Sequence, residues 1–191
     1  MESVGFKEWA VVCEAMGRGR QSIILRKGGI AEGREGFSFK YPEFFLFPTW
    51  FHEQPQKVRS DRGIGSLPMG HGLESPCQIE IRYSARIESS HTITSWDIAQ
   101  ALEPLHILRP DVVRERFEYD EAPGLHVAFM RVFRLKPSWS FPNEKRYGGC
   151  RSWVTLPAIP GNVRFEPILS DAEHEKRKQD FLTVVCAVRN Q

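Results

Sequence analysis

The chain has 191 residues, 41% of them hydrophobic and 26% charged, which suits one sizeable globular domain with a packed core. Its 26 basic residues against 24 acidic ones give a net charge of only +2, too small to indicate a nucleic-acid partner by itself. No apolar run approaches the roughly 20 residues of a membrane-spanning helix. We therefore expect a single domain over residues 1–191 with no membrane partner.

The cysteines and the start of the chain predict a cytoplasmic location. Charged side chains are spread through residues 1–20, which does not fit a secretory signal peptide. The four cysteines are widely scattered and form no Cys-x-x-Cys pair, so the sequence predicts neither a zinc site nor a disulfide framework. No cofactor is expected.

The first half of the chain predicts one helix, two strands and a long loop. Apolar residues recur at spacings of three and four from Phe6 to Met16, which is typical of an amphipathic helix, and Gly17 would follow its end. The apolar runs at 21–25 and 44–47 then predict two strands. Residues 54–78 are rich in proline and glycine, which predicts a long mobile loop.

The second half alternates strands with helices. From Ile79 to Glu88 apolar and charged residues alternate, which predicts a strand with one buried and one solvated face. The further elements expected are helices at 94–102, 110–117 and 170–182 and strands at 125–135, 152–156 and 184–188. Ser170 and Glu173 form the capping-box pattern at the start of the last helix.

These elements predict an α+β fold. We expect an antiparallel or mixed sheet that curls toward a partial barrel and is flanked by three to five helices. The strands at 79–89 and 125–135 should form its centre. If the strand near 21–26 belongs to the same sheet, the chain is one domain.

The segment from Tyr147 to Trp153 concentrates residues suited to binding. The backbone amides of Gly148 and Gly149, together with Arg151, would suit an anion, and the rings of Tyr147 and Trp153 would suit a stacked base. The alternative is a tight turn whose Trp153 packs into the core.

Arg131 and Arg134 complete the set of candidate ligand-binding residues. Arg131 lies among the apolar residues of the strand at 125–135, where an unpaired charge would be costly. One interpretation pairs it with a carboxylate such as Glu118 or Glu88. The other places it at the floor of a cleft, where it binds a phosphate or carboxylate.

No catalytic motif is recognisable, so the sequence leaves open whether the protein is an enzyme. Glu8 and Glu80 are the candidates for holding a divalent metal in a degenerate nuclease or other metal-dependent hydrolase. Arg82, however, stands where such enzymes need a lysine, and alternating charges on a solvated strand explain this pattern equally well. The run Arg26 to Gly29 lacks the ending of a phosphate-binding P-loop and reads as a strand-ending turn.

The chain resembles the uncharacterised bacterial family called domain of unknown function 1802 over about residues 5–156. The motifs that carry this resemblance are Gly5–Ala15, Ile24–Ile30, Phe45–Thr49, Pro104–Ile107 and Tyr147–Trp153. The resemblance implies no activity. The order of elements in the second half is also similar to that of PUA-like barrel domains, many of which bind RNA or modified bases.

Together these patterns favour a nucleic-acid or nucleotide-binding module with no catalysis of its own, whose partner would be RNA, DNA or a nucleotide. The metal-dependent hydrolase is one alternative. The other is a protein-interaction scaffold with Trp50, Phe51 and Trp139 as its contact surface. The oligomeric state cannot be read from the sequence.

Overall fold

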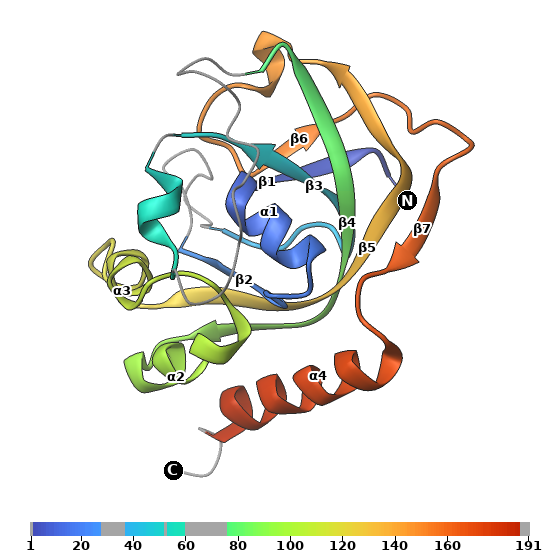
Figure 1. Cartoon of the computed structure of the whole chain (residues 1–191). Coiled ribbons are helices and arrows are strands. Elements are labelled where there is room, and N and C mark those ends of the chain that lie inside the picture. The colour runs from blue at the N-terminus through green and yellow to red at the C-terminus, as the bar shows by residue number, and fades with distance from the viewer. Residues whose placement is uncertain (1, 28–36, 52, 60–75, 188–191) are drawn as a thin grey trace.

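The structure is a computed structural model that describes residues 2–27, 37–51, 53–59 and 76–187. Its strands form one mixed sheet of seven strands, and four α-helices flank the sheet. The sheet curls around α1, with β1 and β3 above this helix and β2 below it, but it does not close into a barrel (Figure 1). The predicted α+β class, with a curled mixed sheet, is confirmed.

The elements have the following bounds. The strands are β1 (Val4–Trp9), β2 (Ile23–Arg26), β3 (Glu43–Thr49), β4 (Gln78–Ile93), β5 (Leu125–Pro142), β6 (Trp153–Thr155) and β7 (Arg164–Pro167). The α-helices are α1 (Ala10–Gly17), α2 (Trp96–Ala101), α3 (Pro110–Phe117) and α4 (Asp171–Cys186). Three short 3-10 helices are η2 (Gln54–Lys57), η4 (Glu103–Leu105) and η5 (Lys145–Tyr147).

The strand order β2-β5-β4-β3-β1-β6 leaves β2 and β6 at opposite ends of the sheet. β7 pairs with the second half of β5, beyond the part that pairs with β2. The β1–β3 pair is parallel, and the other pairs are antiparallel. β4 and β5 pair along most of their length, as expected for the central strands, and two register shifts interrupt the pairing at Ile81/Tyr83 and Ile87/Ser89. Such irregularities let a long strand bend, and this bending curls the sheet.

The first predicted helix is wrong in its first half. Residues Val4–Trp9 form a strand because they pair with β3 on one side and β6 on the other, and both faces of this strand are covered. A strand buried on both faces has no two-residue alternation, so its sequence can imitate a helical pattern. The helix begins at Ala10.

Gly17 is the last residue of α1 and does not lie beyond its end. Gly19, with φ of +66°, takes the left-handed conformation instead. Gly17 lies against the ring of Tyr83, because a Cβ atom added there would meet the ring at 2.0 Å. Close packing against the Tyr83 ring therefore explains why residue 17 is a glycine.

The end of the chain also differs from expectation. α4 begins with the predicted capping box, in which Glu173 N donates to Ser170 Oγ at 3.3 Å and Ser170 N to Glu173 Oε2 at 3.4 Å. The helix continues to Cys186, so the strand predicted at 184–188 is wrong where residues are described. Phe181 and Val185, one helical turn apart, are both buried.

The core lies on both faces of the sheet. Along β3, Phe44 and Leu46 belong to the larger hydrophobic cluster, which also contains residues of α1 and α4. Phe45 and Phe47 belong to a smaller cluster on the other face. The smaller cluster also contains Trp139, which is buried and cannot belong to an exposed contact surface as expected.

Residues 54–59, the start of the segment predicted as a loop, are held in place. Val58 forms a β-bridge with Leu108, and the Arg59 guanidinium contacts the Glu103 carboxylate and the carbonyl oxygens of Glu103 and His106. Residues 60–75 lie outside the described part of the chain.

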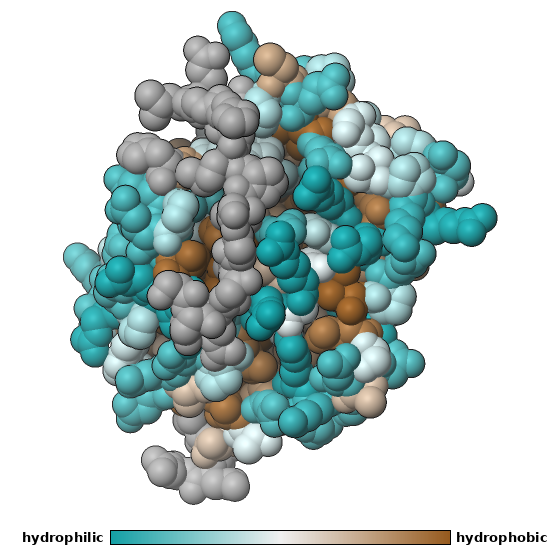
Figure 2. Space-filling view, viewed as in Figure 1, coloured by the Kyte–Doolittle hydropathy of each residue, from teal (hydrophilic) through white to brown (hydrophobic). Residues whose placement is uncertain are grey.

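The visible face of the molecule is mainly hydrophilic, with apolar atoms in separate patches (Figure 2). Among the described residues, no helix combines the length and apolarity needed to cross a bilayer. All four cysteines are unpaired, and Cys77, Cys150 and Cys186 are exposed.

Candidate nucleic-acid interface

The curled sheet brings the end of β2 close to β1. The Arg26 guanidinium, at the last residue of β2, donates from Nη2 to the carbonyl oxygen of Lys7. Its Cζ atom lies 4.8 Å from the centroid of the Phe6 ring. We use the name seam for residues Lys7–Trp9 of β1 together with Arg26, Arg116 and Arg151.

α3 adds a second guanidinium to the seam. Arg116 Nη1 donates to the carbonyl oxygen of Leu25 at 2.9 Å, and its Cζ atom lies 4.5 Å from the centroid of the Trp9 ring. Desolvation lowers the pKa of Arg116 to about 10; Glu8 opposes this shift and the like charge of Arg26 adds to it. Arg116 therefore remains charged at neutral pH, in surroundings that disfavour its charge.

Lys7 ties the glycine segment to β1. Its Nζ atom donates to the carbonyl oxygens of Gly148 at 3.1 Å and Gly149 at 2.9 Å. Burial lowers the pKa of Lys7, and the nearby charge of Arg151 lowers it further. Gly149 has φ of +79°, a conformation that glycine adopts without strain.

The expected anion site on the glycine amides takes a different form. The amide of Gly148 donates to Lys145 O at 3.0 Å, so it is engaged within the chain. The glycine carbonyls, in turn, face a lysine. This segment is therefore a loop that is held by hydrogen bonds to Lys7 and that carries Arg151. The cation beside the loop is Lys7 of β1.

The two aromatic residues of this segment pack inward. Tyr147 is buried in the smaller core cluster, with its ring 5.5 Å from those of Phe47 and Phe141. Trp153 packs edge-on against Phe6, with ring centroids 4.8 Å apart. The indole Nε1 of Trp153 is buried and has no hydrogen-bond partner in the described structure. Both rings thus match the core-packing interpretation of the sequence.

Arg151 has a different environment. Its side chain is exposed and forms no hydrogen bond or ion pair with the described residues. Hydrogen bonds on both sides of it tie its segment to β1: Lys7 N donates to Ser152 O at 2.8 Å, and Lys7 Nζ donates to Gly149 O at 2.9 Å. Among the seven candidate ligand-binding residues, Arg151 is an exposed arginine beside β1.

Arg131 and Arg134 serve other parts of the fold. Arg131 pairs with Asp171 at 2.5 Å, so the expected partners Glu118 and Glu88 are wrong. Arg134 donates to the carbonyl oxygen of Gly17 at 3.1 Å. The seven candidates therefore do not form one group.

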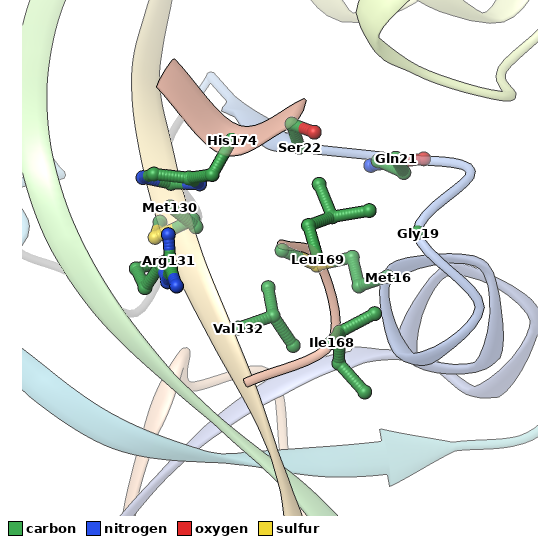
Figure 3. A pocket seen from close by; sticks show the side chains of 10 residues that line it. All are labelled: Met16, Gly19, Gln21, Ser22, Met130, Arg131, Val132, Ile168, Leu169 and His174. Carbon is green, nitrogen blue, oxygen red and sulfur yellow. The ribbon is translucent and has the colours of Figure 1, made fainter. Parts of the chain in front are cut away.

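Arg131 lines a small hollow between β5, α4 and the turn after α1. Figure 3 shows Arg131 and His174 at one side of it and the apolar side chains of Ile168, Leu169 and Met16 at another. The hollow measures about 10 Å³, which is room for about one water molecule. It cannot take a nucleobase.

The two acidic candidates for a metal lie in different environments. Glu8 is buried, and its Oε1 accepts a hydrogen bond from the backbone N of Trp9 at 2.8 Å. Glu80 is solvent-accessible and binds Arg82 Nε at 2.9 Å and Ser138 Oγ at 2.7 Å. Within the described ranges no three His, Cys, Asp or Glu side chains gather in a way that could hold a metal ion. The metal-dependent hydrolase thus gains no structural support.

Sequence reasoning missed Arg116 and Lys7 and read Arg26 as part of a turn. No local pattern marks them, because Arg116 resembles any charged residue of a surface helix. Their common position depends on the curl of the sheet.

A family model covers the region in which the sequence resembles a known family. The model of the family "Domain of unknown function (DUF1802)" matches residues 5–180. The chain belongs to this family. The resemblance noted in the sequence is thereby confirmed, and the match continues into α4. The search of curated proteins found no match to this DUF1802 chain.

Solved structures similar to this DUF1802 chain include the ASCH protein of Zymomonas mobilis. The two chains are 11% identical, and the alignment covers 92% of this chain and 93% of that one with a TM-score of 0.43. A mutant of the same protein aligns over 94% of this chain and 98% of its own at 12% identity, also with a TM-score of 0.43. At these TM-scores the likeness supports no functional inference.

Proposed function

We propose that this protein binds nucleic acid or a nucleotide at the seam and has no catalysis of its own. The observation that carries the proposal is a group of cations without anionic partners. Lys7, Arg26, Arg116 and Arg151 meet around β1, and none forms an ion pair with an acidic residue of the described chain. Glu8 is buried beside them.

The chemistry of these side chains suits phosphate. A guanidinium carries five N–H donors, and Arg26 and Arg116 each donate to one backbone carbonyl oxygen, so further donors remain for an anion. The Arg26 Nε is buried and has no hydrogen-bond partner in the described structure. Stacking on Phe6 and Trp9 holds both guanidiniums in place.

The experiment is a fluorescence-anisotropy titration of labelled RNA and DNA oligonucleotides at low and high salt. If phosphate contacts carry binding, affinity should fall as salt rises. Arg151→Gln should weaken binding and reduce the magnitude of the salt slope by about one. Arg164→Gln is the matched control, since Arg164 is an exposed arginine on β7, at the opposite side of the molecule from α3 (Figure 1).

Two results would contradict the proposal. One is the absence of binding in low salt at micromolar protein. The other is an equal effect of the Arg151 and Arg164 variants, which would indicate attraction by overall charge alone.

The single domain expected over residues 1–191 also stays a proposal, supported by the pairing of β2 with β5 in the common sheet. A single calorimetric unfolding transition, with equal calorimetric and van't Hoff enthalpies, is the expected result. We further propose a cytoplasmic location, since unpaired exposed cysteines suit a reducing compartment.

A further inference from the structure

Two adjacent aromatic residues are exposed where β3 ends. Trp50 and Phe51 follow Thr49, the last residue of β3, and are 40% and 36% exposed. Most aromatic side chains in the described structure are covered; the other exposed large apolar residues are Tyr119 and Phe165. Neighbouring exposed rings indicate a contact surface more strongly than isolated ones.

The Phe51 ring adjoins the seam. The Phe51 ring lies edge-on to Trp9 with centroids 5.0 Å apart, and Trp9 carries the Arg116 guanidinium. The exposed ring of Phe51, the half-buried ring of Trp9 and the guanidinium of Arg116 therefore lie in one row, and Arg116 forms no ion pair with the described residues.

The backbone around the rings is braced. Thr49 Oγ1 donates to Glu8 O at 3.0 Å, and Gln54 Nε2 donates to Thr49 O at 2.6 Å. The Gln54 Oε1 accepts from the backbone N of Val11 at 3.3 Å, and Gln54 is buried. Thr49 and Gln54 are thus held to β1 and α1, which limits the entropy lost when a ligand binds the rings.

We propose that the ligand at the seam is single-stranded nucleic acid, with unpaired bases stacked on Trp50 and Phe51 and an adjacent phosphate held by Arg116. This inference rests on the proposed function and specifies its ligand. Aromatic rings stack on any base whose face is free, and in a duplex those faces are covered. The cations beside the rings form no ion pair with an acidic residue of the described chain, which favours a polyanion over an apolar peptide segment.

The test compares one labelled sequence as single strand and as duplex, with wild type, Trp50→Ala and Phe51→Ala. We expect wild type to prefer the single strand, and each variant to weaken single-strand binding by roughly 5- to 100-fold. Trp50→Phe, which keeps a ring, should retain most of the affinity. Phe165→Ala is the matched control, since Phe165 is equally exposed at 40% and lies on β7.

The outcomes separate this inference from the proposed function. Equal affinity for single strand and duplex, or unchanged binding by both alanine variants, would overturn the stacking platform while leaving phosphate binding at the seam intact. Failure of wild type to bind any oligonucleotide in low salt would overturn both. A thermal melt of each variant shows whether it is folded at the assay temperature, so a loss of affinity is not mistaken for unfolding.

Discussion

Arg26 in β2 and Phe6 in β1 contact each other across the open side of the sheet, with the Arg26 Cζ atom 4.8 Å from the centroid of the phenyl ring. β2 and β6 occupy opposite ends of the strand order, so the curl of the sheet makes this contact possible. The same guanidinium binds the backbone of Lys7. The curl of the sheet therefore brings a guanidinium of β2 against a ring of β1, and this guanidinium keeps donors for a ligand.

Arg116→Met should weaken nucleic-acid binding without lowering the melting temperature. Burial lowers the pKa of Arg116 to about 10, so its charge destabilises the fold at neutral pH, and this destabilisation is lost as pH rises above about 10. Methionine removes the charge and keeps an apolar contact with Trp9. Thermal melts and anisotropy titrations measure the two effects.

The matched control is Arg114→Met on the same helix, where the arginine is exposed and pairs with Glu118 at 2.9 Å. It should bind nucleic acid like wild type. A large fall in melting temperature for the Arg116 variant would show that its contacts with Leu25 and Trp9 outweigh its desolvation.

Arg131→Ala should destabilise the protein by only about 1 kcal/mol. The sequence alone suggests about 3–5 kcal/mol, the value for stranding a buried partner charge. The actual partner, Asp171, has a side chain that is 97% exposed, so water solvates its charge when the arginine is removed. Urea unfolding of Arg131→Ala and Asp171→Asn measures the effect of removing either partner. A loss of more than about 3 kcal/mol in the free energy of unfolding of either variant would contradict a weak, solvated ion pair.

Gly17→Ala should be clearly destabilising, by about 1–3 kcal/mol. The added methyl would overlap the ring of Tyr83, which is buried and held by a hydrogen bond from its hydroxyl to Glu14 at 3.1 Å. Gly161→Ala is the control, because no atom lies within 4 Å of a Cβ there. Equal melting temperatures for the two variants would mean that the Tyr83 ring can move aside.

Acid should weaken the attachment of α4 to the sheet. Burial raises the pKa of Glu88, but hydrogen bonds from Lys178 and His174 outweigh it and lower this pKa below 4.5. A lowered carboxyl pKa contributes stability above pH 4.5 that is lost as pH falls through the folded-state pKa. Glu88→Gln should therefore lose less stability than wild type below pH 4.5.

Urea unfolding between pH 3 and pH 6, in steps of about half a unit, measures this difference. Glu118→Gln is the control and should follow wild type, since Glu118 directly follows α3, is exposed and, within the described residues, forms only a solvent-exposed ion pair with Arg114. If the free energy of unfolding depended on pH equally in wild type and Glu88→Gln, the lowered pKa of Glu88 would be contradicted.

Local signals predicted much of the fold. The alternation at 79–88, the proline that begins α3 and the capping box of α4 each depend on a few neighbouring residues, and the structure confirms all three. β1 was missed because a strand covered on both faces has no alternation. The end of α4 was missed because its β-branched residues favour a strand, whereas burial of Phe181 and Val185 one turn apart favours a helix.

The candidate site depends on contacts that no local pattern records. The sequence marked Arg151 and the glycines beside it, but Lys7, their partner, lies more than a hundred residues away. Arg131 pairs with Asp171, which is 40 positions along the chain. Arg26 and Arg116 meet because the sheet curls and α3 packs at its edge, and these long-range arrangements follow from the whole fold.

An NMR titration of isotope-labelled protein with a short single-stranded oligonucleotide in low salt tests the central claim most directly. The account predicts the largest shifts at the Nε–H groups of Arg26 and Arg116, the Trp9 indole and the backbone of Arg151, with shifts that diminish as salt is added. Shifts confined to the hollow at Arg131, or no shifts at saturating oligonucleotide, would contradict it.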